Sequence, residues 1–114
     1  MEVSEKELEK YLRPNGSCPF DEWLDSLRDK RAKARIQARL IRVRLGNFGD
    51  CKPVGGGVLE LRIDFGPGYR VYLATVGIKL VILLCGGDKS SQSDDIRTAI
   101  EYLEDYKKAG VDNG

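Results

Sequence analysis

Three cationic side chains lie inside or directly beside segments whose pattern is that of a buried β-strand. Arg62 is in "LELRID", Arg70 is in "YRVYLAT", and Lys89 follows the apolar run "IKLVILLC". A buried charge costs free energy unless it is paired or used. Planar guanidinium groups bind two phosphate oxygens at once, so these residue types favour a site for a phosphate or another anion. The competing interpretation is structural, with Arg62 and Arg70 in a salt-bridge ladder and Lys89 in a solvated turn.

The spacing around "FGPGY" predicts a β-hairpin that brings the two arginines together. Residues 59–63 and 69–73 both place apolar side chains at odd-numbered positions. Directly opposed residues share a face, so each buried odd-numbered residue must lie opposite another odd-numbered residue. The numbers of two opposed residues must therefore sum to an even number. A three-residue turn over residues 66–68, which pairs Phe65 with Tyr69, satisfies this condition.

The other face of this hairpin then carries the polar side chains. Glu60, Arg62, Arg70 and Tyr72 share that face, with Arg62 across from Tyr72 and Arg70 one diagonal step away. The two guanidinium groups are therefore expected within reach of one anion. Glu60 or Asp64 could instead pair with Arg62.

Two helices are expected before the hairpin. Residues 20–27 have apolar side chains at i, i+3, i+4 and i+7, which predicts a short amphipathic helix. Residues 30–45 predict a longer helix that ends at Gly46. This helix has two apolar strips, one of Ile36, Leu40 and Val43 and one of Ala34, Ala38, Ile41 and Leu45. Two strips indicate packing against both the sheet and the first helix, in a helical hairpin.

The segment after the hairpin places Lys89 at the end of a strand. Residues 78–85 are almost entirely apolar, as in a central strand covered on both faces. A helix follows, with Ser93 or Asp94 as its expected N-cap. The tail, residues 108–114, is expected to be frayed.

Charge is unevenly distributed, although the net charge is only +1. Residues 28–44 carry eight Lys and Arg against one Asp. A solvated helix face is the ordinary explanation; the alternative is contact with RNA phosphates through Lys33, Arg35 and Arg39. The Gly-rich stretch "CKPVGGGV" lacks the Gly-Lys-Ser/Thr ending of a P-loop and is interpreted as a connector.

Length and composition indicate one domain over residues 1–114. There are three widely spaced cysteines and no histidine, which argues against a zinc site and for a reducing, cytoplasmic location. No cofactor or metal is expected. No signal peptide or membrane-spanning run is recognisable, so no membrane partner is expected.

Four stretches of the chain resemble a known family. They are "PFDEWLDSLRD", "ARIQARLIRVRLGNFGD", "GVLELRIDFGPGYRVYL" and "LLCGGDKSSQSDDIRTA". In this order and spacing they are similar to the HigB-like addiction-module killer proteins, a Gp49-like group of the RelE/ParE toxin superfamily. The resemblance covers about residues 19–99. It implies an α+β, RelE-like fold in the order β-α-α-β-β-β-α, with an antiparallel sheet, an N-terminal helical hairpin and a C-terminal helix. It also favours a strand for the ambiguous first dozen residues.

The resemblance implies the toxin of a type II toxin–antitoxin system that cleaves mRNA on the ribosome without a metal. Arg70 matches the phosphate-stabilising arginine of the family, Arg62 the cation of the preceding strand, and Lys89 the second cation after the last strand. The cognate antitoxin is expected to be a small helix-turn-helix protein.

Three supporting roles accompany these cations. Glu60 is the nearby carboxylate that could act as a base or orient Arg62, Tyr72 could stack on a base, and Gln92 could donate a hydrogen bond. The last helix departs from RelE because "SDDIRTA" has no catalytic tyrosine. Two other functions stay open: a ParE-type DNA gyrase inhibitor without catalysis, and an inactive copy that only binds antitoxin.

Overall fold

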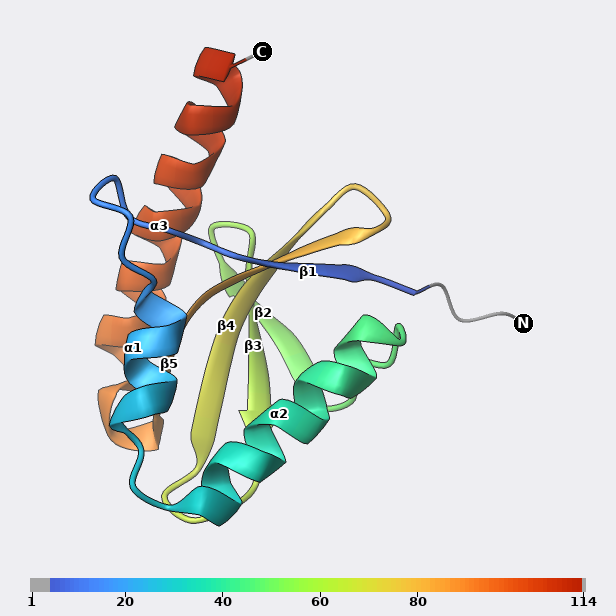
Figure 1. Cartoon of the computed structure of the whole chain (residues 1–114), viewed down its shortest axis with the longest axis vertical. Helices are drawn as coiled ribbons and strands as arrows, with labels where there is room; N and C mark the ends of the chain where they lie inside the picture. The colour runs from blue at the N-terminus through green and yellow to red at the C-terminus, as the bar shows by residue number, and fades with distance from the viewer. Residues whose placement is uncertain (1–4, 114) are drawn as a thin grey trace.

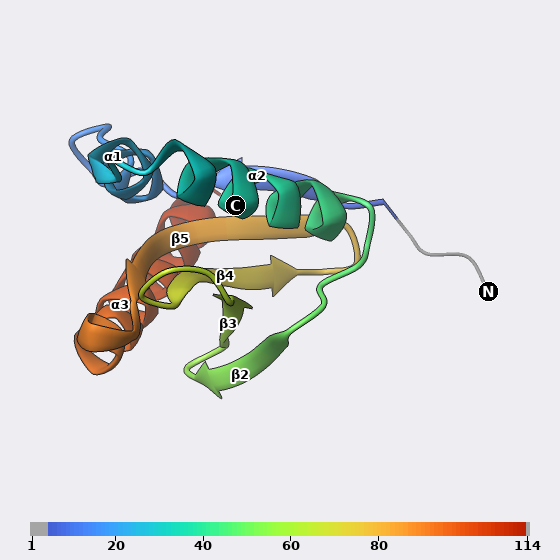
Figure 2. The same ribbon diagram turned by 90° about the horizontal axis from the view of Figure 1, so that it is seen from below.

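A five-stranded β-sheet lies between two layers of helix in the computed structural model, which describes residues 5–113 (Figures 1 and 2). Along the chain the elements are β1 (Glu7–Lys10), α1 (Pro19–Ser26), α2 (Lys30–Arg44), β2 (Cys51–Gly55), β3 (Val58–Ile63), β4 (Tyr69–Val76), β5 (Leu80–Asp88), a 3₁₀ turn η1 (Lys89–Ser91) and α3 (Gln92–Asn113). The mixed α+β class and the C-terminal helix expected from the sequence are confirmed. No helix among the described residues is long and apolar enough to cross a membrane.

The expected element order and the antiparallel sheet are wrong in two respects. The strand order is β1-β5-β4-β3-β2, and β1 pairs with β5 in parallel while the other pairs are antiparallel. The stretch interpreted as a connector contains an additional edge strand, β2. Pro53 is tolerated there because an edge strand does not need every N–H for the ladder. Gly56, at φ +62° and against Ile100, makes the tight turn into β3.

The β3–β4 hairpin has the expected faces but a different register. Ile63 pairs with Tyr69, and Arg62 lies directly opposite Arg70 rather than opposite Tyr72. The turn therefore spans residues 64–68, five residues rather than three. Its own backbone hydrogen bonds hold it, among them the bond from the N–H of Gly68 to the carbonyl of Phe65 at 3.1 Å. Lengthening the turn by two residues keeps the even sum, so the odd-numbered side chains stay on one face.

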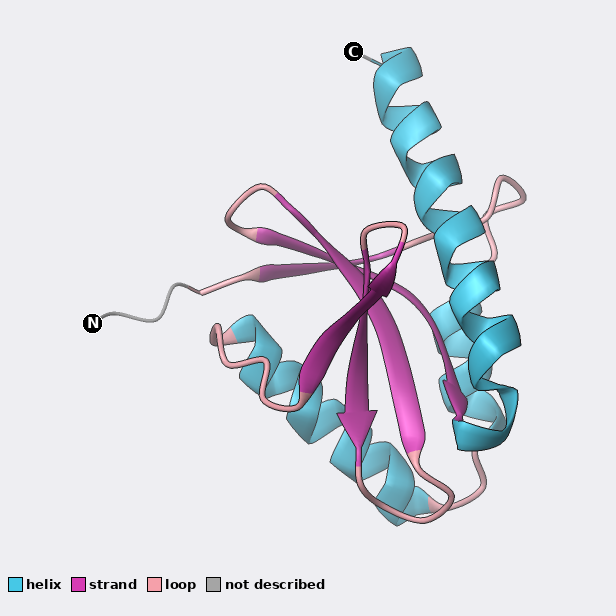
Figure 3. Ribbon diagram, turned by 180° about the vertical axis from the view of Figure 1, so that it is seen from behind, coloured by secondary structure: helices cyan, strands magenta, loops and turns pink. Residues whose placement is uncertain are grey.

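Each face of the sheet has its own hydrophobic core. The α1–α2 face buries Phe20, Ile36, Leu40, Val43, Leu61, Ile63, Val71, Leu73, Val81 and Leu83. The α3 face buries Tyr11, Val58, Tyr72, Ala74, Ile82, Leu84, Cys85, Ala99 and Leu103. The polar face predicted for the hairpin is therefore the face on which α3 packs (Figure 3).

The two N-terminal helices lie on the same face but diverge from each other (Figure 1). α1 packs against β5, whereas α2 packs against β3. The first apolar strip of α2 is buried as expected. The second strip is exposed, with Ile41 at 52% and Leu45 at 50%, so the expected packing of α2 against the first helix is wrong. α2 begins at the side chain of Asp29, which accepts hydrogen bonds from the N–H groups of Arg31 and Ala32.

The start and the end of the last helix also differ from expectation. Asp88, rather than Ser93 or Asp94, provides the cap: its carboxylate accepts a hydrogen bond from the N–H of Ser90 at 2.8 Å, where η1 begins. α3 continues to Asn113, although the composition predicts a frayed tail from residue 108. Gly114 lies outside the described residues.

Two glycines at the end of β5 let side chains from both faces reach the backbone. A bulge shifts the β4–β5 register between Tyr72 and Leu73, so that Leu84 and Cys85 both lie on the α3 side. A Cβ at Gly86 would lie 2.2 Å from the Trp23 ring, and one at Gly87 would lie 1.8 Å from the Asp95 carboxylate. This close approach of α1 and α3 fixes the position of the strand end from which Lys89 follows.

Gly86→Ala is expected to destabilise the fold by about 3 kcal/mol, because its methyl group overpacks against the Trp23 ring. Urea unfolding measures the change. Gly110→Ala, in α3 with open space around it, is the matched control and is expected to raise stability slightly. Equal effects of the two substitutions would show that the Trp23 contact does not constrain β5.

Candidate functional site

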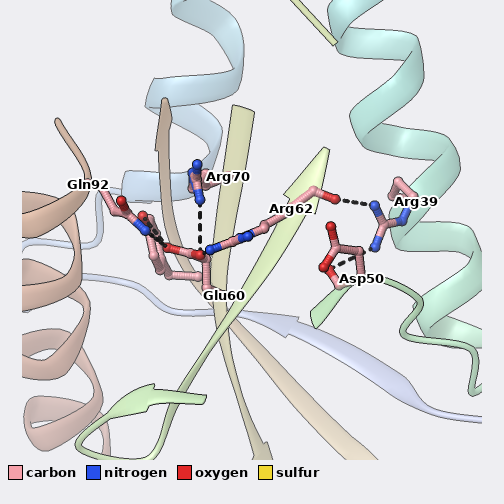
Figure 4. Close-up of polar contacts among 7 residues, drawn as sticks. Arg39, Asp50, Glu60, Arg62, Arg70 and Gln92 are labelled. Atoms are coloured by element: carbon pink, nitrogen blue, oxygen red, sulfur yellow. Dashed lines mark hydrogen bonds and ion pairs between the residues drawn. The ribbon is translucent and has the colours of Figure 1, made fainter. Parts of the chain in front are cut away.

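The carboxylate of Glu60 is fully buried and binds both site arginines. Its Oε1 accepts hydrogen bonds from Nε of Arg62 and from Nη1 of Arg70, each at 3.0 Å (Figure 4). Arg62 and Arg70 extend from opposed positions on β3 and β4, so one oxygen lies between two cations. The prediction that the two guanidinium groups lie side by side is confirmed, and the salt bridge to Glu60 that competed with it is present as well.

The other oxygen of Glu60 is held by two neutral donors. Oε2 accepts a hydrogen bond from Nε2 of Gln92 at 2.7 Å and one from the Tyr72 hydroxyl at 3.3 Å. Burial raises the pKa of Glu60, but the hydrogen bonds from Gln92 and Arg62 and the charge of Arg70 outweigh it, so the pKa lies below its ordinary value. Glu60 is an ionised, fully bonded carboxylate, and the alternative that it acts as a general base is not favoured.

An open hollow of about 270 Å³ brings the three predicted cations together. Its lining consists of Asp50, Arg62, Ile63, Asp64, Gly68, Tyr69, Arg70 and Lys89. Lys89 reaches the hollow from η1, and its Cβ lies 3.6 Å from the position of a Cβ on Gly68. Among the described residues Lys89 makes no ion pair, and the adjacent Asp88 is used as a cap. The ammonium group is therefore free to meet a ligand.

Arg70 lines this hollow and has a side-chain donor that makes no hydrogen bond. Its side chain is only 10% exposed, and Nε is buried without a hydrogen-bond partner, unlike the other buried side-chain polar atoms of the described residues. A buried donor without an acceptor costs about 1–3 kcal/mol. Arg62 is more open, with 37% of its side chain exposed. An oxyanion in the hollow could accept from both guanidinium groups and approach Lys89.

Two carboxylates in the hollow were not predicted as site residues. Asp50 and Asp64 line it together with the three cations, and neither forms an ion pair among the described residues. Asp50 precedes a strand that the sequence did not reveal, so no pattern indicated its place. Asp64 was considered only as a partner for Arg62.

Tyr72 lies at the site but does not have its expected role. The side chain is fully buried in the α3-side core, with its hydroxyl bound to Glu60. Burial and the negative charge of Glu60 raise the pKa of Tyr72. A ring without exposed surface cannot stack on a nucleobase, so that expectation is wrong. Gln92 does donate the hydrogen bond expected of it, but to Glu60 rather than toward the hollow.

Arg39 does not present a free cation, although it was predicted to contact RNA. Its guanidinium group donates to the backbone carbonyls of Arg62 and Asp50, the latter at 3.4 Å (Figure 4). It also donates to the backbone carbonyl of Phe48 at 2.9 Å. Burial lowers the pKa of Arg39. Arg39 therefore connects α2 to the strand that carries Arg62, and its role is to position that strand.

The other two basic residues predicted on α2 lie in different surroundings. Arg35 is exposed, and its guanidinium carbon lies 4.8 Å from the centre of the Phe65 ring. Lys33 is partly exposed near the start of α2 and makes no ion pair in the described part of the chain. Of the three, Arg35 retains a charged group with both an aromatic contact and access to solvent.

Among the known proteins compared, a relative matches most of this chain. The chain is 60% identical over 80 residues to a Haemophilus influenzae protein described as uncharacterized. The aligned region covers 70% of this chain and 81% of the relative. No protein-family model matches the chain, and no solved structure matches it.

Glu60→Gln is expected to lower the free energy of unfolding by about 3 kcal/mol near neutral pH, because the buried Arg70 loses its counter-charge. The pKa of Glu60 is lower in the folded state, so its contribution is complete above about pH 4.5 and is lost as the pH falls through the folded pKa. The stabilities of the two proteins should therefore converge in acid, as measured by urea unfolding from about pH 3 to pH 7. Glu104→Gln, exposed on α3, is the control. A constant difference across this range would contradict the ion-pair assignment.

Proposed function

We propose the function from the site, because this chain belongs to the same family as the uncharacterized Haemophilus influenzae protein, whose name assigns no activity. The proposed function is that of a metal-independent endoribonuclease that cleaves mRNA on the ribosome. The observation that carries the proposal is the hollow in which Arg62, Arg70 and Lys89 meet, with the buried Nε of Arg70 unpartnered. Such a constellation is suited to a phosphodiester. The motif resemblance to HigB-like proteins supports the same reaction and a RelE-like fold.

The proposed reaction is internal attack by the ribose 2′-hydroxyl. The 2′-oxygen forms a bond to the adjacent phosphorus, the bond from phosphorus to the 5′-oxygen breaks, and the products carry a 2′,3′-cyclic phosphate and a 5′-hydroxyl. The non-bridging oxygens gain negative charge in the transition state. Arg62 and Arg70, already oriented by Glu60, can stabilise that charge without reorganising.

Proton transfer requires an acceptor for the 2′-hydroxyl and a donor for the 5′-oxygen. Glu60 does not serve as acceptor, because its oxygens are occupied by four donors. Asp50 and Asp64 line the hollow, and one of them takes this role. Lys89, exposed and unpaired among the described residues, is the donor.

In this proposal the protein is the toxin of a type II toxin–antitoxin pair and acts in the cytoplasm. A small helix-turn-helix antitoxin holds it inactive until needed. The support for these partners is the resemblance in sequence. The basic surface of α2 is compatible with approach to ribosomal RNA, since exposed Lys and Arg attract phosphates.

Lys89→Gln is expected to slow mRNA cleavage about 100-fold through loss of the proton donor, while leaving the fold intact because Lys89 is exposed. The measurement is mapping of mRNA 5′ ends and growth after induction without antitoxin. Arg97→Gln, which removes another exposed positive charge, on α3, is the control and should cleave at the rate of the unchanged protein.

Growth arrest with no new 5′ ends would overturn the nuclease proposal. Accumulation of stalled gyrase–DNA complexes in that case would identify a gyrase inhibitor. Normal growth of cells producing the unchanged, folded protein would identify an inactive copy.

A further inference from the structure

A cation and an aromatic ring are in contact near the proposed phosphate site. Phe65 is a half-buried residue of this turn, and Arg35 lies on the exposed surface of α2. The guanidinium carbon of Arg35 is 4.8 Å from the centre of the Phe65 ring, a cation–π contact. The ring holds the guanidinium in place and leaves the outward side of the cation accessible.

A hollow of about 370 Å³ opens at this pair. Its lining is Arg31, Ala34, Arg35, Ala38 and Phe65. Two alanines and one aromatic ring supply apolar lining, and the remaining two side chains are cations. The hollow is wide open to solvent. Apolar surface next to two cations suits a planar ring that is attached to an anion.

A third depression shares lining residues with both the hollow at Phe65 and the phosphate site. That depression, of about 270 Å³, is lined by Arg35, Ala38, Arg39, Arg42, Ile63 and Asp64. It shares Arg35 and Ala38 with the hollow at Phe65, and it shares Ile63 and Asp64 with the hollow that holds Arg62, Arg70 and Lys89. The three depressions are therefore neighbours on the surface beside the β3–β4 turn.

We propose that the hollow at Phe65 binds a nucleobase of single-stranded RNA, stacked on the Arg35 guanidinium, while a neighbouring phosphate of the same strand occupies the cation site. This inference rests on the proposed function for its substrate class. Bases of single-stranded RNA stack on aromatic rings and on Arg guanidinium planes. An acidic peptide would satisfy the cations but would leave the alanines and the aromatic ring of the lining without a matching group.

Two matched substitutions separate stacking from charge. Arg35→Lys keeps the positive charge and removes the plane. Phe65→Leu keeps an apolar side chain in the turn and removes the ring that supports Arg35. Arg44→Lys, the same change at an exposed position near the end of α2, is the control.

The probes are a single-stranded RNA hexamer with a 2′-O-methyl group at each position to prevent cleavage, and an abasic strand of equal length and charge. The unchanged protein is expected to bind the base-bearing strand about tenfold more tightly than the abasic strand. Arg35→Lys and Phe65→Leu should lose this preference while binding the abasic strand as before, and Arg44→Lys should retain it.

Equal affinity for the two strands, or no binding to either, would overturn the proposal. A preference that survives in both variants would place the base elsewhere and would also overturn it. Tighter binding of a Glu-rich peptide of equal charge, weakened by Arg35→Lys, would identify a peptide site instead. The probes cannot be cleaved, so this binding test does not depend on nuclease activity. If the protein keeps the base preference but cleaves no mRNA, only the proposed reaction is refuted.

Discussion

The buried carboxylate of Glu60 is the interaction on which the site depends. A charge of this kind costs several kcal/mol to remove from water unless donors surround it. Here donors come from three elements: Arg62 on the same strand, Arg70 and Tyr72 on β4, and Gln92 at the start of α3. One side chain therefore connects two strands to the helix that covers their polar face. A defect in any partner leaves a buried polar group unpaired, so this network constrains both the fold and the position of the cations.

Strand β3 is held from both faces of the sheet at the same place. On the α3 face Glu60 orients the side chain of Arg62, and on the α2 face Arg39 binds the backbone carbonyl of Arg62. The bonds to Glu60 use Nε of Arg62 and Nη1 of Arg70, and Nε of Arg70 stays buried without an acceptor. These contacts therefore restrict the positions of the two arginines that line the hollow. A ligand anion meets cations whose positions are already set, which is the physical basis of electrostatic preorganisation.

A large part of this arrangement could be predicted from local patterns. Odd-numbered apolar residues on β3 and β4 placed Glu60, Arg62, Arg70 and Tyr72 on one polar face, because side chains alternate along any strand. The bounds of α1 and α2 followed from helical periodicity and from Gly46. The same reasoning failed where more than one backbone conformation fits the pattern of residues. Turns of three and of five residues both keep the even sum, and only the hydrogen bonds within the loop select the longer turn. Pro53 and the glycines near it are typical of a connector, so the sequence pattern did not predict β2.

The sequence by itself determined the polar face with its two arginines, the place of Lys89 after a strand, and the class of fold, since these depend on residue type and on short-range periodicity. Only the tertiary structure decided which groups remain free to act. Tyr72 and Arg39 have side chains suited to RNA, but packing buries one and binds the other to backbone carbonyls. Asp50, Phe65 and Arg35 line the hollows beside the turn through contacts between segments far apart in the chain. Burial and hydrogen bonding across such distances are properties of the folded molecule, so no local pattern could reveal them.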